Sequence, residues 1–264
     1  MRPGEAFERR CYEYLKSIYK DKNVTFEWDG GMDSTVSDIA VVKNNYVDFY
    51  IEVKDSNAQS GQFVLLANES ERRFIFSPGN KSEENDMTDI IIDYMNNDFD
   101  RFNNAGTAGA ALDIDNHVFS SWIIDHYSRM NAKYFISCYH GDFVIFPIRC
   151  FDKYFDVVST YRVKKSGSTE PAKRDFPIVK NIIEQLIGNV RFCEEGKKLY
   201  VELNSRPRSD RFKLGDYTYY FSDKGNNRYE IKRLSNTYNM NVIFGIELKR
   251  GQDPVDRLEF EADL

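Results

Sequence analysis

Two carboxylates and a lysine stand close together near the start of the chain. Asp38 opens an apolar run, and Glu52 and Lys54 follow one hairpin's length later on a second apolar run. Because side chains alternate faces along a strand, Glu52 and Lys54 project to the same side. Carboxylate oxygens suit a hard divalent cation, and a neighbouring lysine can orient a water and stabilise a developing negative charge. The three residues therefore predict metal-assisted hydrolysis, with Asp38 and Glu52 as metal ligands.

The apolar pattern of the same two runs predicts how they pair. Ile39 and Val41 share one face of the first run, and the face opposite to Glu52 in the second run carries an apolar row made of Val47, Phe49, Ile51 and Val53. The two rows coincide only if paired positions sum to an even number, which places 38 opposite 52. A two-residue turn at Asn44-Asn45 breaks that parity, so we expect a three-residue loop, Asn44 to Tyr46, or a bulge. The Cβ atoms of Asp38 and Glu52 then lie about 5 Å apart.

The same residue pattern also arises by chance in a chain of which 30% is charged. The alternative interpretation of Glu52 and Lys54 is a solvated strand face. Glu247 and Lys249 repeat the spacing on a later apolar run, but no Asp lies one hairpin upstream, so we treat that pair as a decoy. Other catalytic systems are not indicated, since the sequence has neither the Cys and His pairs of a zinc site nor a Gly-x-Ser-x-Gly elbow.

The arrangement resembles the motif of the PD-(D/E)XK nuclease superfamily. Asp38 matches the first carboxylate, Glu52 the second and Lys54 the lysine, while Ser37 stands where the name of the motif has proline. The segment 4–15 also looks like the opening helix of these folds, which often carries a glutamate near the metals. With its length and its appended C-terminal region, the chain looks most like a type II restriction endonuclease.

This resemblance implies a fold and a reaction. Residues 1–150 would form a PD-(D/E)XK nuclease core of α/β class, with a mixed central β-sheet flanked by helices, and residues 151–264 a basic and β-rich DNA-recognition region. The implied activity is Mg²⁺-dependent, site-specific cleavage of double-stranded DNA, for which a twofold homodimer is the simplest assembly. The implied metal ligands are Asp38, Glu52, the carbonyl of Val53 and a glutamate of the first helix, Glu5 or else Glu8.

Three other functions stay open at this point. Holliday-junction resolvases look similar over the same N-terminal residues, although they are much shorter. A DNA-binding protein without activity is a second alternative, against which the intact Asp38, Glu52 and Lys54 speak. An RNA substrate is not distinguished from DNA by anything in the sequence.

The net charge of −6 argues against a nucleic-acid partner until it is divided along the chain. Residues 1–148 have a net charge of −10, residues 149–215 of +6 and residues 216–264 of −2. Such asymmetry is typical of proteins with a polyanionic partner, although a solvated surface helix can look similar.

Basic clusters in the positive segment supply candidate DNA contacts. Lys and Arg bind phosphates or guanine edges, and serines donate hydrogen bonds to phosphates. Because no apolar period runs through 161–168, we expect a loop there, and the alternative for each cluster is an ordinary solvated loop. The candidates are Arg162, Lys164, Lys165, Ser166, Ser168, Lys173, Arg174, Arg206, Arg208, Arg211, Lys213 and, after the catalytic motif, Gln62.

The surrounding elements follow from hydrophobic periodicity. Helices are expected over 5–19, from about Gln59, within 83–100 with Ile90, Ile91 and Tyr94 inward, and over 118–130. Strands are expected at 24–28 and 74–76, as a hairpin over 134–139 and 143–146, and as several short strands beyond 200. This order also predicts a mixed sheet flanked by helices.

Composition limits where the protein is expected to work. No apolar stretch approaches the length of a membrane span, and the N-terminus lacks the apolar run of a signal peptide. The four cysteines are dispersed without a CxxC pair, which predicts reduced core residues in a cytoplasmic protein without a membrane partner.

Overall fold

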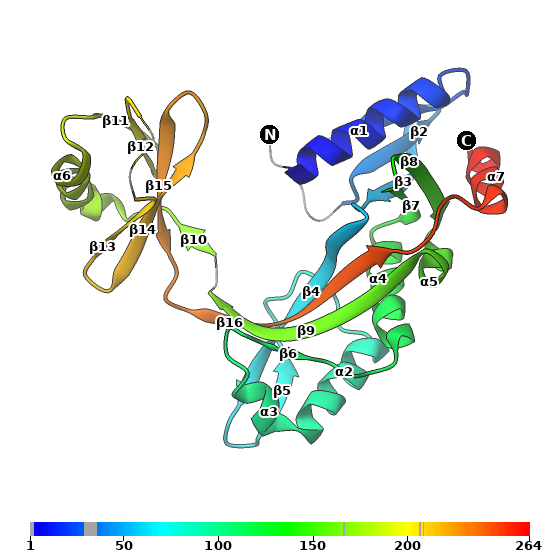
Figure 1. The fold of residues 1–264 in the computed structure, drawn as a ribbon, viewed down its shortest axis with the longest axis horizontal. Helices are drawn as coiled ribbons and strands as arrows, with labels where there is room; N and C mark the ends of the chain where they lie inside the picture. Colours follow the sequence, from blue (N-terminus) through cyan, green and yellow to red (C-terminus); the bar gives the residue numbers. More distant parts are fainter. Residues whose placement is uncertain (1–2, 29–35, 166, 206, 208) are drawn as a thin grey trace. The chain divides into compact units, whose positions relative to one another are not determined.

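The structure is a computed structural model that describes residues 3–28, 36–165, 167–205, 207 and 209–264 (Figure 1). It divides into two compact units. Unit 1 comprises Met1–Val163 and Met240–Leu264, and unit 2 comprises Lys164–Asn239. The expected division after residue 150 differs from this one, because the chain returns to unit 1 after unit 2 for most of a strand and for the last helix.

Within the described residues, unit 1 holds two β-sheets and the helices that cover them. Its helices are α1 (Pro3–Ile18), α2 (Asp86–Asn97), α3 (Phe99–Asn103), α4 (Asn116–Arg129), α5 (Phe151–Tyr154) and α7 (Pro254–Asp263), with the 3₁₀ turn η1 (Ile148–Cys150). Its strands are β1 (Thr25–Trp28), β2 (Ile39–Lys43), β3 (Tyr46–Val53), β4 (Asn57–Asn68), β5 (Arg73–Phe76), β6 (Ala110–Ala111), β7 (Ala132–Tyr139), β8 (Asp142–Pro147), β9 (Phe155–Lys165) and β16 (Tyr238–Leu248). The last two residues of β9 and the first two of β16 belong to unit 2.

The first sheet has the strand order β1-β2-β3-β7-β8. Neighbouring strands are antiparallel except β3 and β7, which are parallel because a long crossover that includes α4 joins them. Phe7, Cys11 and Leu15 recur every four residues on α1, so they form one apolar stripe that is buried on this sheet together with Phe260 of α7. The opposite face packs against α4. The mixed sheet flanked by helices is thus confirmed.

The β2–β3 hairpin contains the bulge that the sequence allowed. Ile39 pairs with Ile51, so paired positions sum to an even number until a register shift after Val41. The turn Asn44-Asn45 has φ values of 52° and 66°, which is the left-handed geometry of a two-residue hairpin turn. The three-residue loop is therefore wrong, and the bulge is confirmed. Val47 lies beyond the bulge and is exposed, so it does not join the apolar row.

The second sheet, β5-β4-β16-β9-β6, includes two long strands that the sequence did not predict, β4 and β9. β4 replaces the helix expected from about Gln59, because Phe63 and Leu65 are buried on one face and the strand pairs with the distant β16. β9 extends through most of the loop expected at 161–168, since every second residue from Phe155 to Tyr161 is buried. Both predictions were wrong because the polar residues of these two segments lie on the exposed face of a strand. They were interpreted as signs of a helix and of a loop.

Helices α2, α3 and α4 cover one face of the second sheet. The ring of Trp122 on α4 lies 4.6 Å from the ring of Phe244, measured between centroids. Gly61 of β4 has a φ of +134°, and an added Cβ would lie 2.7 Å from the Trp122 ring, so this contact requires glycine. On α2 the expected inward side chain of Ile91 is fully buried, whereas Ile90 is 44% exposed.

Unit 2 is a second, β-rich body with its own core. Its strands are β10 (Ser168–Thr169), β11 (Arg191–Glu195), β12 (Lys198–Glu202), β13 (Arg211–Leu214), β14 (Tyr217–Asp223) and β15 (Arg228–Leu234), and its helices are η2 (Lys173–Asp175) and α6 (Phe176–Ile187). The antiparallel sheet has the order β11-β12-β15-β14-β13, with β10 beside β15. Phe176, Val179 and Ile183 of α6 cover one face of it. The β-rich C-terminal region is confirmed.

Two further expectations, about a membrane span and about the cysteines, can be compared with the structure. In the part of the chain that the structure describes, no helix combines the length and the apolar character needed to cross a membrane. The four cysteines are free. Cys11 is buried, and the partly buried Cys138 and Cys150 pack against the cores of unit 1, in agreement with the expectation of core cysteines for these three.

Candidate active site

The β2–β3 hairpin brings the two acidic motifs to the same place. Asp38 directly precedes β2, and its Oδ2 accepts a hydrogen bond of 2.9 Å from the backbone N–H of Val53. Val53 lies between Glu52 and Lys54, so this bond holds the first carboxylate beside the other two side chains. The structure thus brings Asp38, Glu52 and Lys54 together, as the parity of the apolar rows predicts.

Glu52 and Lys54 point away from the face of β3 that packs on α1. Glu52 is 4% exposed, and its carboxylate forms an ion pair with the ammonium of Lys54. The same ammonium lies 5.1 Å from the ring centroid of Tyr127 on α4. The backbone N–H of Lys54 donates to the carbonyl of Ile136 in β7 over 3.0 Å. A strand therefore fixes the backbone of Lys54, and a carboxylate and a ring contact its charged end.

Burial and the neighbouring charge of Glu52 disfavour the charged form of Asp38. Desolvation, followed by the negative charge of Glu52, raises the pKa of Asp38 to about 7, although Lys54 and the N–H of Val53 oppose the rise. Burial alone would lower the pKa of Lys54, but the charges around it, chiefly that of Glu52, raise that pKa well above its ordinary value. Lys54 therefore stays cationic, and its single charge does not offset both carboxylates.

Asp38 and Glu52 fit a small divalent cation. Their oxygens are hard ligands, and a raised pKa is the response of a buried carboxylate beside a like charge without a cation. Among the described residues, no group of three or more His, Cys, Asp and Glu side chains is arranged to hold a metal. A cation on this pair would complete its shell with a backbone carbonyl and waters, which is how Mg²⁺ is commonly bound.

Glu8 of α1 lies within electrostatic range of this pair. Burial raises the pKa of Glu8, and the negative charge of Asp38 raises it further. The indole N–H of Trp28 donates to the Glu8 carboxylate over 3.4 Å. The first helix thus carries a glutamate whose pKa is raised in part by the charge of Asp38. The ligand role of Glu5, in the first turn of the same helix, stays a prediction.

Two neighbours of Lys54 were not identified from the sequence. Tyr127 and His126 lie in the helix expected over 118–130, and neither is among the site residues that the sequence indicated. His126 stacks on Trp122 at 4.9 Å between ring centroids, and burial, then the charge of Lys54, lowers its pKa. Helical spacing shows which face of α4 is inward. It does not show which strand that face meets, so no signal in the sequence joined these residues to Lys54.

The candidate DNA contacts lie on several elements of the two units. In unit 1, Arg162 and Gln62 are exposed on β9 and β4, and the Gln62 side chain accepts a hydrogen bond from Gln59 over 3.1 Å. Three candidates, Ser166, Arg206 and Arg208, lie outside the described residues. The other candidates belong to unit 2, with Lys164 and Lys165 at the end of β9, Ser168 in β10, Lys173 and Arg174 in η2, and Arg211 and Lys213 in β13.

The unit 2 candidates differ in their local partners. The hydroxyls of Ser168 and Tyr220 are 2.9 Å apart. Arg174 reaches the carboxylate of Asp175 at 3.7 Å but stays 89% exposed. Lys165 lies over the ring of Tyr238, with 5.8 Å between its ammonium and the ring centroid. Arg211 and Lys213 are exposed and alternate with the buried Phe212, so they share the open face of β13.

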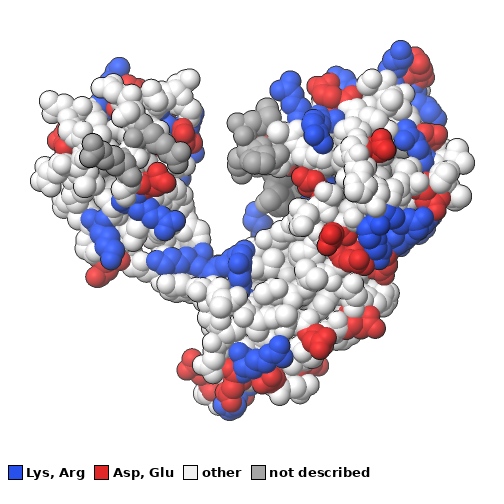
Figure 2. Space-filling view, viewed as in Figure 1, with Lys and Arg blue, Asp and Glu red and all other residues white. Residues whose placement is uncertain are grey.

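Charge separates the two units. Unit 2 has 16 Lys and Arg residues against 10 Asp and Glu, a net charge of +6. The rest of the chain has 20 against 32, a net charge of −12. Figure 2 shows basic side chains in blue and acidic ones in red on one face of the molecule. The unit with the three candidate catalytic residues is acidic, and the unit with most of the candidate DNA contacts is basic.

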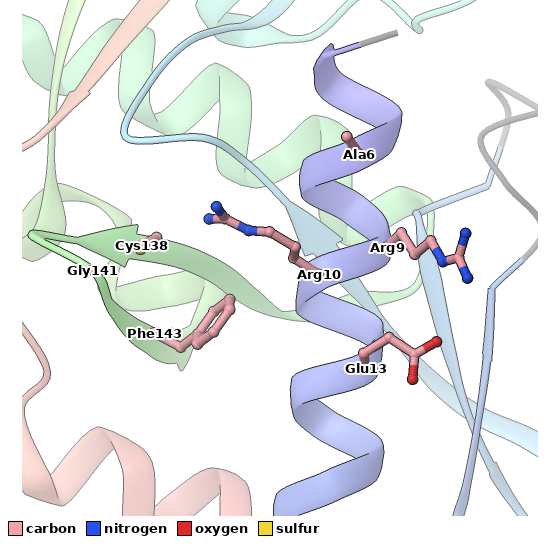
Figure 3. A pocket seen from close by; sticks show the side chains of 7 residues that line it. All are labelled: Ala6, Arg9, Arg10, Glu13, Cys138, Gly141 and Phe143. Carbon is pink, nitrogen blue, oxygen red and sulfur yellow. The ribbon is translucent and has the colours of Figure 1, made fainter. Parts of the chain in front are cut away.

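A separate cleft of about 460 Å³ lies beside α1 and the β7–β8 turn (Figure 3). Arg10 extends from α1 toward Cys138 and Phe143, while Arg9 and Glu13 extend from the other side of the helix. Asp38, Glu52 and Lys54 do not line this cleft. It is therefore distinct from the place where the carboxylates meet.

Similarity to a solved structure extends over both units. A structure of HhaI endonuclease in complex with DNA matches with a TM-score of 0.84 and 37% sequence identity, over 98% of this chain and 97% of that chain. No protein-family model matches the chain, and neither does any curated protein. The resemblance is therefore not confined to the hairpin motif.

Proposed function

The chain belongs to the family of HhaI endonuclease, a type II restriction enzyme, and on that premise we propose that it is a Mg²⁺-dependent endonuclease that cuts double-stranded DNA at a specific sequence. The observation that carries this proposal is the hydrogen bond from the N–H of Val53 to Asp38, which holds that carboxylate beside Glu52 and Lys54. These are the side-chain types that metal-assisted hydrolysis of a phosphodiester requires. The DNA in the complex of HhaI endonuclease supports DNA as the substrate here.

The mechanism divides the chemistry among few residues. Asp38, Glu52 and the carbonyl of Val53 would hold Mg²⁺, with Glu8 or Glu5 as a further ligand. When bound, Mg²⁺ polarises the scissile phosphate and lowers the pKa of a bound water. Lys54 orients the attacking water and stabilises the negative charge that develops on the phosphate.

DNA binding is assigned to the exposed candidates of both units. Lys and Arg that neutralise phosphates release counterions, and this gives affinity without sequence preference. The net charge of +6 on unit 2 supports this role for it. The assigned residues are Arg162, Gln62, Lys164, Lys165, Ser168, Lys173, Arg174, Arg211 and Lys213, together with Ser166, Arg206 and Arg208.

Assembly and location complete the proposal. A twofold homodimer stays a prediction, based on the need to cut both strands of a duplex. Sedimentation of the protein with and without a DNA duplex measures the number of subunits. A cytoplasmic location is supported by the four free cysteines, since a reducing compartment keeps thiols unpaired.

The test is a digest of a plasmid of known sequence beside a synthetic four-way junction, each with Mg²⁺ and with EDTA. Discrete plasmid fragments that appear only with Mg²⁺ are the expected result. Cutting of the junction alone would instead indicate a structure-specific nuclease. A retarded but uncut plasmid would indicate a DNA-binding protein without activity.

Matched lysine variants locate the reaction within the chain. Lys54→Ala is expected to abolish cleavage and to leave DNA binding largely intact. Lys249→Ala is the control, because Lys249 stands in the second Glu-x-Lys of the chain and pairs with Asp156 at 2.8 Å. If Lys54→Ala cuts as well as the unchanged protein, the assignment of Lys54 is wrong.

A further inference from the structure

Lys54 needs a support other than Glu52. The ammonium of a lysine sits at the end of a flexible stem, so the strand alone does not place it. Its ion-pair partner, Glu52, is also a proposed ligand of the divalent cation. A carboxylate that shares its charge with another cation attracts Lys54 less strongly. A group whose attraction does not depend on the charge of Glu52 is therefore required to keep the ammonium in place.

The ring of Tyr127 lies where such a support is needed. The ammonium of Lys54 is 5.1 Å from the ring centroid, within the range of about 6 Å over which an aromatic face attracts a cation. Tyr127 is 6% exposed, and the side chain of Lys54 is 15% exposed. Water competes little with this contact, and the attraction of a cation to a ring is strongest where water is excluded.

The strand β3, which carries Glu52, and its neighbour β7 also fix the ring. Tyr127 packs edge-on against Phe135, with 5.4 Å between ring centroids and 84° between ring planes, and Phe135 pairs with Glu52 across β3 and β7. The turn after α4 is tied to β3, because the N–H of Tyr50 donates to the carbonyl of Asn131 over 3.0 Å. The position of Tyr127 is therefore set relative to Lys54 by backbone pairing and by packing.

His126, which precedes Tyr127, does not work against this contact. Its ring stacks on Trp122, and burial and the charge of Lys54 both lower its pKa. The imidazole therefore stays neutral near neutral pH and does not repel the ammonium of Lys54.

We infer that Tyr127 is a positioning residue, whose ring face holds the Lys54 ammonium for the hydrolysis proposed above. The inference rests on the proposed function and adds a residue that acts through Lys54. The inference assigns this role to the aromatic face. The Tyr127 hydroxyl also interacts with Lys54 as a hydrogen-bond partner, so its share is tested separately. The prediction is a fall in the rate of the chemical step without a fall in DNA affinity.

Three variants test this inference in single-turnover cleavage with saturating enzyme and in DNA binding with Ca²⁺ in place of Mg²⁺. Tyr127→Leu removes the ring and is expected to lower the cleavage rate about 30-fold, which corresponds to about 2 kcal/mol. Tyr127→Phe keeps the ring and is expected to lie within about threefold of the unchanged protein. Tyr161→Leu is the control for lost packing, because Tyr161 is also a buried ring of unit 1 and packs against Phe74 and Phe102.

The outcomes separate the inference from its alternatives. A slow Tyr127→Leu beside an active Tyr127→Phe and an active Tyr161→Leu, all with unchanged DNA affinity, supports it. Equal losses in Tyr127→Leu and Tyr161→Leu would show a stability effect and overturn it. Equal losses in Tyr127→Leu and Tyr127→Phe would assign the role to the hydroxyl and overturn it too. If the unchanged protein cuts no DNA, the proposed function fails first and the inference falls with it.

A measurement without cleavage covers the case in which Tyr127→Leu does not fold. A cation held over a ring places its neighbouring methylene protons in the shielding region of that ring. The NMR resonances of the Lys54 side chain, assigned by comparison with Lys54→Arg, are therefore expected to be shifted upfield in the unchanged protein and in Tyr127→Phe. Ordinary lysine shifts in the folded, unchanged protein would overturn the inference.

Discussion

Unit 1 and unit 2 both pack helices on β-sheets, but they differ in charge and in chemistry. Unit 1 has a net charge of −12 and contains Asp38, Glu52 and Lys54, whereas unit 2 has a net charge of +6 and contains most of the candidate DNA contacts. A hydrolytic site that uses carboxylates to hold a cation tolerates an acidic surrounding. Attraction of a polyanion needs the opposite sign. The net charge of −6 for the whole chain therefore says little about its partner, because it averages two units of opposite charge.

The largest expected effect concerns the proposed hydrolytic site of unit 1. Asp38→Asn keeps the shape of the side chain but removes a negative charge that the proposed metal needs, so the cleavage rate is expected to fall about 1000-fold or more. The affinity for a DNA duplex in Ca²⁺-free buffer is expected to stay unchanged, since Asp38 is not among the candidate DNA contacts. An Asp38→Asn protein that still cuts would place the hydrolytic site elsewhere in the chain.

The division into two units is tested by core variants. Ile183 on α6 and Ile123 on α4 are both fully buried, one in the core of each unit. Ile183→Ala is expected to cost about 3 kcal/mol of stability. Hydrogen exchange followed by mass spectrometry should show the lost protection in 164–239 and not in the β2–β3 hairpin. Ile123→Ala should show the reverse, and loss of protection throughout both units in either variant would contradict the division.

Within unit 1, one buried carboxylate, that of Asp256, joins α7 to α5. Burial alone would raise the pKa of Asp256, but the ammonium of Lys153 at 2.8 Å and the hydroxyl of Tyr154 at 2.5 Å lower it below its ordinary value. A lowered pKa in the folded state stabilises the protein above the unfolded pKa of about 4, and that stability is lost as the pH falls through the folded value. Asp256→Asn is expected to cost about 2 kcal/mol at pH 7.

Thermal unfolding of both proteins from pH 7 to pH 3 measures this contribution. The midpoints of the unchanged protein and of Asp256→Asn should approach each other below about pH 4. A difference that does not change with pH would show that the charge of Asp256 does not stabilise α7.

The smallest expected effect concerns the open face of β13 in unit 2. Removing both cations with Arg211→Ala and Lys213→Ala is expected to weaken DNA binding about tenfold near 0.1 M salt and to reduce the salt dependence by about two counterions. The cleavage rate at saturating DNA should not change. Arg72→Ala with Arg73→Ala is the matched control, because these two cations belong to unit 1 and pair with Asp100 and Glu71. Equal losses in both double variants would remove the distinction between the units.

The sequence predicted correctly those helices and strands whose structure depends on residues close to one another in the sequence. The helix over 5–19 and the hairpin over 134–146 have periodic apolar residues within a short stretch, and both are present as α1 and as β7 with β8. The prediction failed for the segment after Gln59 and for 161–165, which are strands of the second sheet. The pairing partner of β4 is β16, which lies far along the sequence, so nothing near Gln59 indicates it. The preference of a segment for the β-strand conformation depends largely on the strands with which it pairs.

The sequence by itself determined that Asp38 and Glu52 meet, because a slip of one residue in the β2–β3 pairing would turn the apolar side chain of Ile51 to the wrong face. Only the tertiary structure decided that Tyr127 and Glu8 lie around that site, and that residues 240–264 pack with the N-terminal part of the chain. These contacts join segments that are distant in the sequence. They depend on which buried surfaces pack against each other, and the local hydrophobic periodicity of a segment does not show which surface it will contact.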